Sequence, residues 1–305
     1  MSRCLHCGHE HVPQISAFAE GDDVEKSAVE QLASQIKDEK DKEFKELLTN
    51  KKDSLRVEDV FASRMEKSLS QAKSNLVSAI KEILRQGKGS YLLTLTPEQL
   101  NNYLMDKGLK DALQVFSDAQ LDIRDLVVQN MRTFSPSFTS SNLALFPLLK
   151  TTTTDALFND QILSASAKSV KEALLTAATT QNVGAAIKQL EEGLQKATGV
   201  QITEARTKIS EMNRSLTATA AEAADLKYFY YSGPKDSITR PFCRKLVGKV
   251  VSASDMNKLS NGTPGSSALI QGGGYNCRHS WTAVSKEFCD RLNLQILTSA
   301  EVKQL

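Results

Sequence analysis

The side chains best suited to chemistry are gathered in two stretches of the chain. All five cysteines and all four histidines lie within residues 4–11 or 243–289. Thiolate and imidazole groups are the usual protein ligands of Zn²⁺, and they also supply the nucleophile and base of thiol enzymes. Since the number of cysteines is odd and the sequence starts without the apolar core of a signal peptide, we expect a reducing compartment in which the thiols bind metal or stay free.

The N-terminal group is the segment CLHCGHEH. Cys4 and Cys7 have the spacing of a zinc knuckle, and the glycine that follows lets backbone amides approach a thiolate. His9 and His11 would complete four ligands, in a spacing tighter than that of ordinary zinc fingers. These four residues are therefore candidate ligands of a structural zinc. The alternatives are that the two cysteines share a metal with cysteines from the later stretch, or that the segment is a tail without a ligand.

The C-terminal group consists of Cys243, Cys277 and His279. Residues two apart in an extended segment point to the same face, so Cys277 and His279 should lie side by side. A tetrahedral zinc takes four ligands, of which this group supplies three. Two other interpretations stay open. In the first, the cysteines are small buried residues and the histidine is a hydrogen-bonded turn residue. In the second, a cysteine and the histidine form a nucleophile–base pair, although no residue spacing identifies such a pair.

Polar residues around these candidates favour a structural role. The segment Gly233–Ser237 is rich in turn-forming residues, and Asp236 can accept hydrogen bonds from the backbone amides that follow it. Arg240, which precedes a proline, can make a bidentate contact with a carboxylate, and Asp236 is the nearest one. Together with Thr239 and Asn276, these residues are predicted to form a network that locks loops to one another.

Binding to DNA is a further alternative. Between Tyr228 and Val251 the chain has five lysines or arginines against one acidic residue, interleaved with the aromatic residues Tyr228, Phe229, Tyr230 and Tyr231. This composition suits contact with phosphates and stacking on bases, although surface lysines over a small core are the more frequent explanation. The formal net charge of +2 excludes a general nucleic-acid coat.

The rest of the chain is predicted to be a helical scaffold, because apolar residues recur there at helical spacing. The expected helices cover 20–86, 97–106, 108–116, 118–132 and 154–224, with breaks near 182–184 and at Gly199. Between residues 62 and 83 the apolar spacing alternates between three and four, which is typical of a coiled-coil seam. We expect this seam to face a partner or a second copy of the chain, or to be buried in an intramolecular bundle.

The character of the sequence changes after Asp225, where aromatic residues, glycines and short apolar runs such as KLVGKVV favour strands and turns. Two short helices are expected at the end, over 285–293 and 299–305. The predicted fold class is α+β, with a long helical N-terminal two-thirds and a small mixed α+β C-terminal domain. The predicted limits are 1–19 for the Cys/His-rich knot, 20–224 for the scaffold with a subdivision near 133–153, and 225–305 for the α+β domain. No run of eighteen apolar residues exists, so no membrane span is expected.

The C-terminal motifs in combination resemble a known family. An aromatic-rich entry is followed by GPKDSITRPFC, then by GKVV and then by GGGYNCRHSW. This order is similar to that of the phage Mu F-like domain of head morphogenesis proteins. The motifs of that family are an Asp-x-x-Thr-Arg element, a following His or Cys, a Gly-Lys-Val strand and a late Asn-Cys-Arg-Cys/His element. The resemblance covers Tyr228 to Val284, and the helical segment ITEARTKISEMNRS just upstream is similar to the family's helical lead-in.

The resemblance implies a minor structural protein of a double-stranded DNA phage. Such a protein would contact portal or capsid proteins during head assembly or DNA delivery, with contact to genomic DNA and homo-oligomers as further expectations. It would be found in the host cytoplasm during assembly and then in the virion. Zinc would fall on Cys243, Cys277 and His279. Cys243 stands where many members have histidine and His279 where many have cysteine, and both exchanges keep a zinc-ligand type.

Two other functions are kept as alternatives to a virion protein. The first is an enzyme, such as a nuclease, transferase or thiol hydrolase, that uses Cys243, Cys277 and His279. The second is a zinc-dependent DNA-binding protein that uses the basic and aromatic stretch from Tyr228 to Val251.

Overall fold

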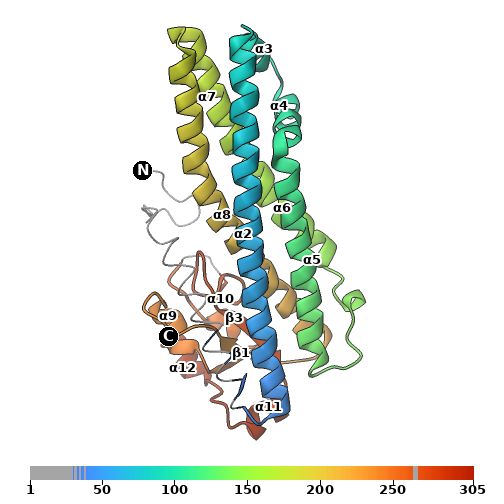
Figure 1. Ribbon diagram of the computed structural model, residues 1–305. Coiled ribbons are helices and arrows are strands. Elements are labelled where there is room, and N and C mark those ends of the chain that lie inside the picture. Colours follow the sequence, from blue (N-terminus) through green and yellow to red (C-terminus); the bar gives the residue numbers. More distant parts are fainter. Residues whose placement is uncertain (1–29, 31–32, 34–35, 38, 264–266) are drawn as a thin grey trace. The chain divides into compact units, whose positions relative to one another are not determined.

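The computed structural model describes residues 30, 33, 36–37, 39–263 and 267–305. Helices make up most of this part of the chain, and a three-stranded antiparallel sheet lies towards its C-terminus (Figure 1). The predicted fold class, a long helical region with a small α+β region, is confirmed. The predicted N-terminal zinc ligands Cys4, Cys7, His9 and His11 lie outside the described residues.

The helices and strands follow one another as α2 (Lys42–Arg85), α3 (Gly89–Leu93), α4 (Pro97–Leu104), α5 (Lys110–Arg132), α6 (Phe146–Leu157), α7 (Ser164–Thr180), α8 (Val183–Ala223), β1 (Tyr228–Ser232), α9 (Pro241–Leu246), β2 (Val250–Ser252), α10 (Ala268–Gln271), β3 (Ser280–Val284), α11 (Lys286–Arg291) and α12 (Ser299–Lys303). Short π-helical turns, η1 (Met105–Leu109) and η3 (Phe158–Leu163), join α4 to α5 and α6 to α7. Within the described residues, none of the helices is long and apolar enough to cross a membrane.

The contacts of the chain group it into two compact units. The first comprises the described residues of Met1–Asp59 together with Gln120–Leu149 and Thr207–Leu305, and the second comprises Val60–Ala119 and Lys150–Arg206. The helices α2, α5 and α8 each contribute residues to both units. These units combine separate segments of the chain, whereas the domain limits predicted from the sequence divide it into continuous stretches. Those limits stay a prediction.

Several helix limits follow from local sequence signals. α4 begins as predicted at Pro97, because the Thr96 side chain accepts a hydrogen bond from the Gln99 amide and the Gln99 side chain caps Thr96 in return. The break predicted near residue 182 is also found, with Gln181 in the left-handed conformation between α7 and α8.

Other limits differ from the expectation. α8 continues through Gly199, since one glycine inside a helix costs only about 1 kcal/mol and buried residues on either side outweigh it. α5 likewise has no break at Ser117. α6 begins at Phe146, inside the expected loop, because Pro147 is acceptable in a first helical turn. The KLVGKVV run begins in helix α9, and only its last two residues enter strand β2.

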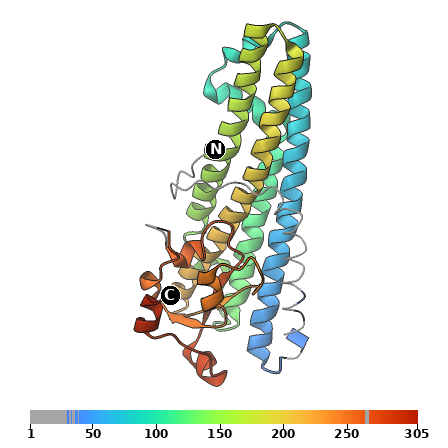
Figure 2. The ribbon, with the colours of Figure 1, turned by 90° about the vertical axis from the view of Figure 1, so that its left-hand side faces the viewer.

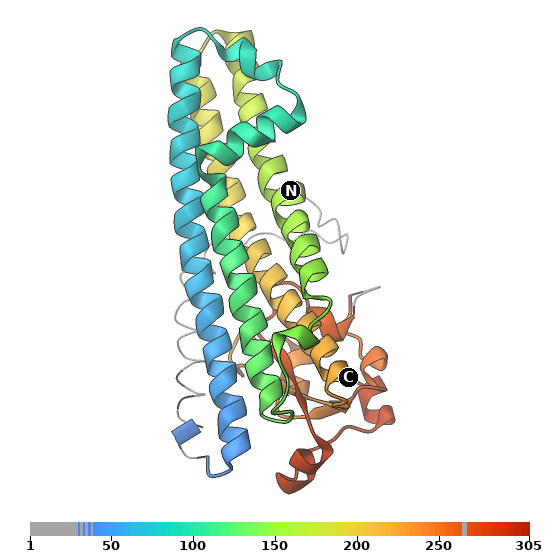
Figure 3. The ribbon, with the colours of Figure 1, turned by 90° about the vertical axis from the view of Figure 1, so that its right-hand side faces the viewer.

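The predicted seam of α2 is buried inside the second unit. Met65, Leu69 and Leu76 are each at most 3% exposed, and Phe61 packs on Phe116 of α5 with ring centroids 5.9 Å apart. The seam is therefore intramolecular, and the expectation that it forms an oligomer surface is wrong. Gly108, with φ of 120°, makes the kink within η1, where a Cβ would lie only 3.0 Å from the Ala72 Cα of α2. Figure 3 shows the change of direction from α4 into α5.

Truncation of the seam should therefore destabilise the protein itself. We expect Leu76→Ala, at a 1% exposed position, to lower the free energy of unfolding by about 2–5 kcal/mol, because it leaves a cavity in the core. Val60→Ala, on the same helix but 58% exposed, is the matched control and should change it by about 0.5 kcal/mol or less. Urea denaturation measures both. Equal small changes, accompanied by dissociation of an oligomer in sedimentation experiments, would contradict the intramolecular assignment.

The first unit is organised around the sheet, whose strand order is β2-β1-β3 (Figure 2). Side chains alternate between the two faces of β1. One face carries Tyr230, which packs with Leu47, Phe44 of α2 and Phe288 of α11 in an apolar cluster. The neighbouring residue, Tyr231, points to the other face, where β1 pairs it with Trp281 of β3. The candidate metal centre lies on that second face.

Candidate metal centre

Separate elements bring Cys243, Cys277 and His279 together. Cys243 lies in α9, Cys277 in the loop after α10, and His279 directly before β3. The two sulfur atoms are 3.7 Å apart, and the Cys277 sulfur is 3.8 Å from Nδ1 of His279. All three ligand atoms lie within 4.8 Å of one another. The predicted pairing of Cys277 with His279 is confirmed, and the tertiary fold adds Cys243.

These distances are those of a tetrahedral metal centre. Zinc–sulfur bonds of about 2.3 Å place two sulfur ligands about 3.8 Å apart, and a zinc–nitrogen bond of about 2.1 Å gives about 3.6 Å between sulfur and nitrogen. The corresponding distances in the protein are 3.7 and 3.8 Å. Two thiols and one imidazole also form a ligand set that suits Zn²⁺. Two of the three ligand separations therefore match those of a zinc centre, and the three residues could hold a metal ion.

The surroundings orient each ligand. Nε2 of His279 lies 2.8 Å from the carbonyl oxygen of Pro234, so this nitrogen donates and Nδ1 keeps its lone pair on the side of the sulfur atoms. The backbone amide of Gly273 donates to the Cys277 sulfur at 3.1 Å. Gly233 has φ of 153°, and a Cβ built there would lie only 2.3 Å from the imidazole ring of His279. Only glycine allows this close approach.

The site distinguishes its two thiols electrostatically. A hydrogen bond from Cys243, supported by His279 and Arg214, holds the pKa of Cys277 well below its ordinary value. The pKa of Cys243 is raised, first by its hydrogen bond to Cys277 and then by burial. Of the two thiols, Cys277 therefore loses its proton more readily, and Cys243 donates the hydrogen bond between them. A lowered thiol pKa favours metal binding, because the thiolate is the form that ligates.

Arg214 of α8 is a central residue of this site that sequence reasoning missed. Its side chain is 1% exposed, and its guanidinium donates to the carbonyl oxygens of His279 at 2.9 Å and Cys277 at 3.4 Å, and also to that of Ile270. Arginine donors in a fixed fork can hold several acceptors at once. The sequence gives no signal that singles it out, because Arg214 is one of several polar residues within a long predicted helix.

A second buried cation lies on the same side of the module. Lys51 of α2 is 4% exposed, and its Nζ donates to the carbonyl oxygen of Arg278 at 3.3 Å. Burial lowers the pKa of Lys51, and the Arg214 charge adds to this effect. Arg214 and Lys51 thus attach α8 and α2 to the 277–279 segment through its backbone.

The predicted loop-locking residues are in part rearranged. Asp236 and Thr239 do contact each other, with the Thr239 hydroxyl 2.9 Å from the carboxylate. The predicted pairing of Arg240 with Asp236 is wrong: Arg278 contacts that carboxylate at 2.8 Å, and Arg240 donates to the carbonyl oxygen of Tyr275 at 2.6 Å. The observed pair of Arg278 and Asp236 joins two loops that are distant in sequence. The predicted pair of Arg240 and Asp236 would have lain within a single loop.

Asn276 ties its loop to α8 through its backbone. Its amide donates to the hydroxyl of Thr207 at 3.1 Å, and its φ of 54° is a left-handed conformation that asparagine tolerates. We predicted that the Asn276 side chain would hold the loop backbone, but the contact is made by the Asn276 backbone amide.

No family model matches the chain, and the comparisons with curated proteins and solved structures find no match either. The chemistry of the site must therefore be argued from its own geometry. Cys243, Cys277 and His279 are 1, 3 and 4% exposed, beneath Tyr231 and Trp281. A thiolate and an imidazole at such depth are placed to bind an ion.

The remaining candidates of the sequence are placed elsewhere. Cys289 is buried in the cluster on the opposite face of the sheet, and burial raises its pKa to about 11. Among the aromatic residues of the suspected DNA-binding stretch, Phe229, Tyr230 and Tyr231 are at most 9% exposed. They are core residues of the sheet and cannot stack on bases.

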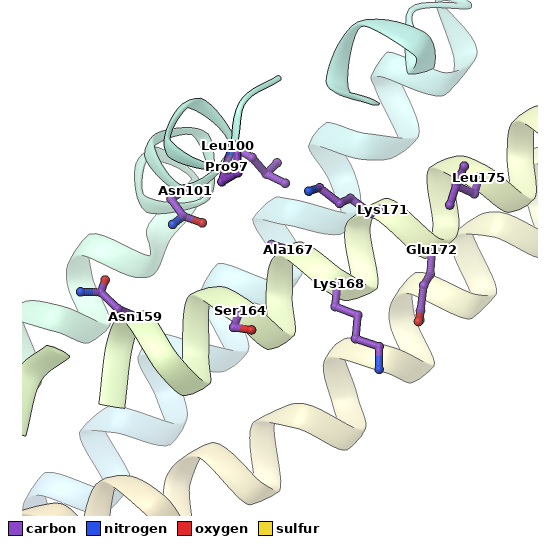
Figure 4. A pocket seen from close by; sticks show the side chains of 10 residues that line it. All are labelled: Pro97, Leu100, Asn101, Asn159, Ser164, Ala167, Lys168, Lys171, Glu172 and Leu175. Atoms are coloured by element: carbon purple, nitrogen blue, oxygen red, sulfur yellow. The ribbon is translucent and has the colours of Figure 1, made fainter. Parts of the chain in front are cut away.

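A separate open hollow of about 440 Å³ lies in the second unit, between α4 and α7 (Figure 4). Its lining is mixed, with Leu100 and Pro97 of α4 opposite Lys171 of α7, which points towards them. The ten residues that line it include neither cysteine nor histidine. This hollow therefore offers neither a thiol nor an imidazole group.

Proposed function

We propose that this chain is a structural assembly protein of a phage head whose C-terminal module is fastened by a zinc ion on Cys243, Cys277 and His279. The motif order from Tyr228 to Val284 supports the phage assignment through its resemblance to head morphogenesis proteins. The observation that carries the structural role is the burial of all three ligand side chains, each at most 4% exposed. Portal or capsid proteins are the proposed partners.

Zinc would add stability by joining two segments that contain little regular secondary structure. The loop that contains Cys277 has no regular secondary structure, and α9, which contains Cys243, is only six residues long. A structural zinc replaces part of a hydrophobic core in such small modules, and its binding free energy becomes folding free energy. The sheet, the loops and α9 would then present one rigid surface to the partner proteins.

The zinc content of purified variants tests the metal site. We expect the full-length chain to hold about one zinc ion at this site, and Cys277→Ser to lose it, because a serine hydroxyl is a poor zinc ligand. Cys289→Ser is the matched control: it removes another buried cysteine of the same module, on the opposite face of the sheet, and should keep the ion. Replacing Cys4 and Cys7 together separates any N-terminal ion. Equal zinc content in all variants would end the metal hypothesis.

The assembly role is tested on particles from cells that produce this chain. Phage particles banded by density should contain the protein in few copies, and peptide mass spectrometry measures its amount relative to the major capsid protein. Cys277→Ser should lower incorporation, whereas Cys289→Ser should not. Absence of the wild-type protein from purified particles would contradict the proposal.

A further inference from the structure

Three ligands would leave one corner of a metal tetrahedron open, and the Tyr231 hydroxyl lies beside two of these ligands. Its hydroxyl oxygen lies 3.3 Å from the Cys243 sulfur and 3.7 Å from the Cys277 sulfur. In a tetrahedral zinc centre, a sulfur and an oxygen ligand are about 3.5 Å apart. The hydroxyl therefore stands at the separation from both sulfur atoms that a fourth ligand requires.

The Tyr231 side chain is held in this position by packing on both sides. Its ring stacks on the imidazole of His279, with centroids 5.5 Å apart and an angle of 13° between the planes. It also packs on Trp281, its partner across the sheet, with centroids 4.3 Å apart. The side chain is fully buried. A buried tyrosine usually finds a polar partner for its hydroxyl, and here the partners are the two candidate ligand sulfurs.

We propose that Tyr231 is the fourth ligand of this metal centre, so that the C-terminal module closes the site with its own residues. This inference rests on the metal site of the proposed function. It assigns no ligand role to Cys4, Cys7, His9 or His11 at this centre.

Titration of the full-length chain with Co²⁺ tests the assignment, because the visible bands of Co²⁺ report both the number and the type of its ligands. We expect Tyr231→Phe, which keeps the ring and its stacking, to weaken Co²⁺ binding by at least about tenfold and to change the visible bands. Tyr230→Phe is the matched control: this neighbouring tyrosine is similarly buried but faces the other side of the sheet, and should leave both unchanged. Circular dichroism establishes that each variant is folded.

The outcomes separate this inference from the proposed function. Absence of Co²⁺ and Zn²⁺ binding by the wild-type chain would overturn both. A second outcome is that the wild-type chain binds Co²⁺, that Cys277→Ser abolishes this binding, and that Tyr231→Phe changes neither its affinity nor its spectrum. This outcome would overturn only the assignment of Tyr231 as a ligand. A third outcome is that replacement of Cys4 and Cys7 changes the visible bands of Co²⁺ while Tyr231→Phe does not. The fourth ligand would then come from the N-terminal segment, and this inference would be wrong.

Discussion

Replacement of Arg214 by methionine should lower the free energy of unfolding by about 3–4 kcal/mol. The methionine side chain has a similar length but no donors, so the carbonyl oxygens of Ile270, Cys277 and His279 lose a charged partner. Hydrogen bonds to charged groups contribute about 1.5–3 kcal/mol each, although their losses do not add fully. Urea denaturation followed by the fluorescence of Trp281, the single tryptophan, reports the loss directly in the affected module.

Two companion variants separate charge from geometry. Arg214→Lys keeps the charge but cannot reach three acceptors, so we expect an intermediate loss and weaker zinc binding. Arg64→Met is the control, since Arg64 forms a surface ion pair with Asp118 at 3.1 Å and its side chain is 51% exposed. Such pairs contribute at most about 1 kcal/mol. A change no larger for Arg214→Met than for Arg64→Met would show that Arg214 does not hold the loop.

Replacement of Gly273 by alanine should abolish zinc binding and lower the free energy of unfolding by about 2–3 kcal/mol. A Cβ at this position would lie 2.3 Å from the Cys243 sulfur and 3.5 Å from the Cys277 sulfur, in space that the ligands occupy. Because Cys243 is held among Tyr231, Cys277 and Phe242, it cannot withdraw, and overpacking of this kind typically costs 1–3 kcal/mol. Thermal unfolding together with zinc analysis measures both effects.

A second substitution distinguishes crowding from a backbone effect. In Gly273→Ala combined with Cys243→Ala the sulfur is absent, so we expect most of the stability to return while zinc binding stays lost. Gly199→Ala, in the interior of α8 with nothing within 4 Å of its Cβ position, should raise stability by up to about 1 kcal/mol. If the double variant were as unstable as Gly273→Ala, contact with the Cys243 sulfur would not be the cause.

The contacts of the site also explain why sequence reasoning identified some residues and not others. The types and local spacing of ligands are visible in the sequence: Cys277 and His279 are two residues apart in an extended segment and therefore share a face. Helical spacing likewise predicted α2 and α8, although the Gly199 break was wrong because packing along a long helix outweighs one weak residue.

Two contacts of the centre depend on the tertiary structure alone. Arg214 and Cys277 are 63 residues apart in the chain. Only the packing of α8 against the loop brings the Arg214 guanidinium to the carbonyl oxygen of Cys277. Which of the adjacent residues Tyr230 and Tyr231 faces the cysteines is decided by the pairing of β1 with β3, which sets Tyr231 opposite Trp281. A shift of one residue would exchange the two tyrosines, and nothing within β1 itself excludes that shift.

The sequence by itself therefore determined the helical scaffold, the α+β C-terminal region and the three soft ligands. Each of these depends on residue type or on spacings of two to four residues. The tertiary structure decided that the α2 seam is internal, that Arg278 and not Arg240 contacts Asp236, and that Arg214 and Tyr231 complete the site. These contacts join residues far apart in the chain, and their free energies exist only once the loops, helices and strands have packed together.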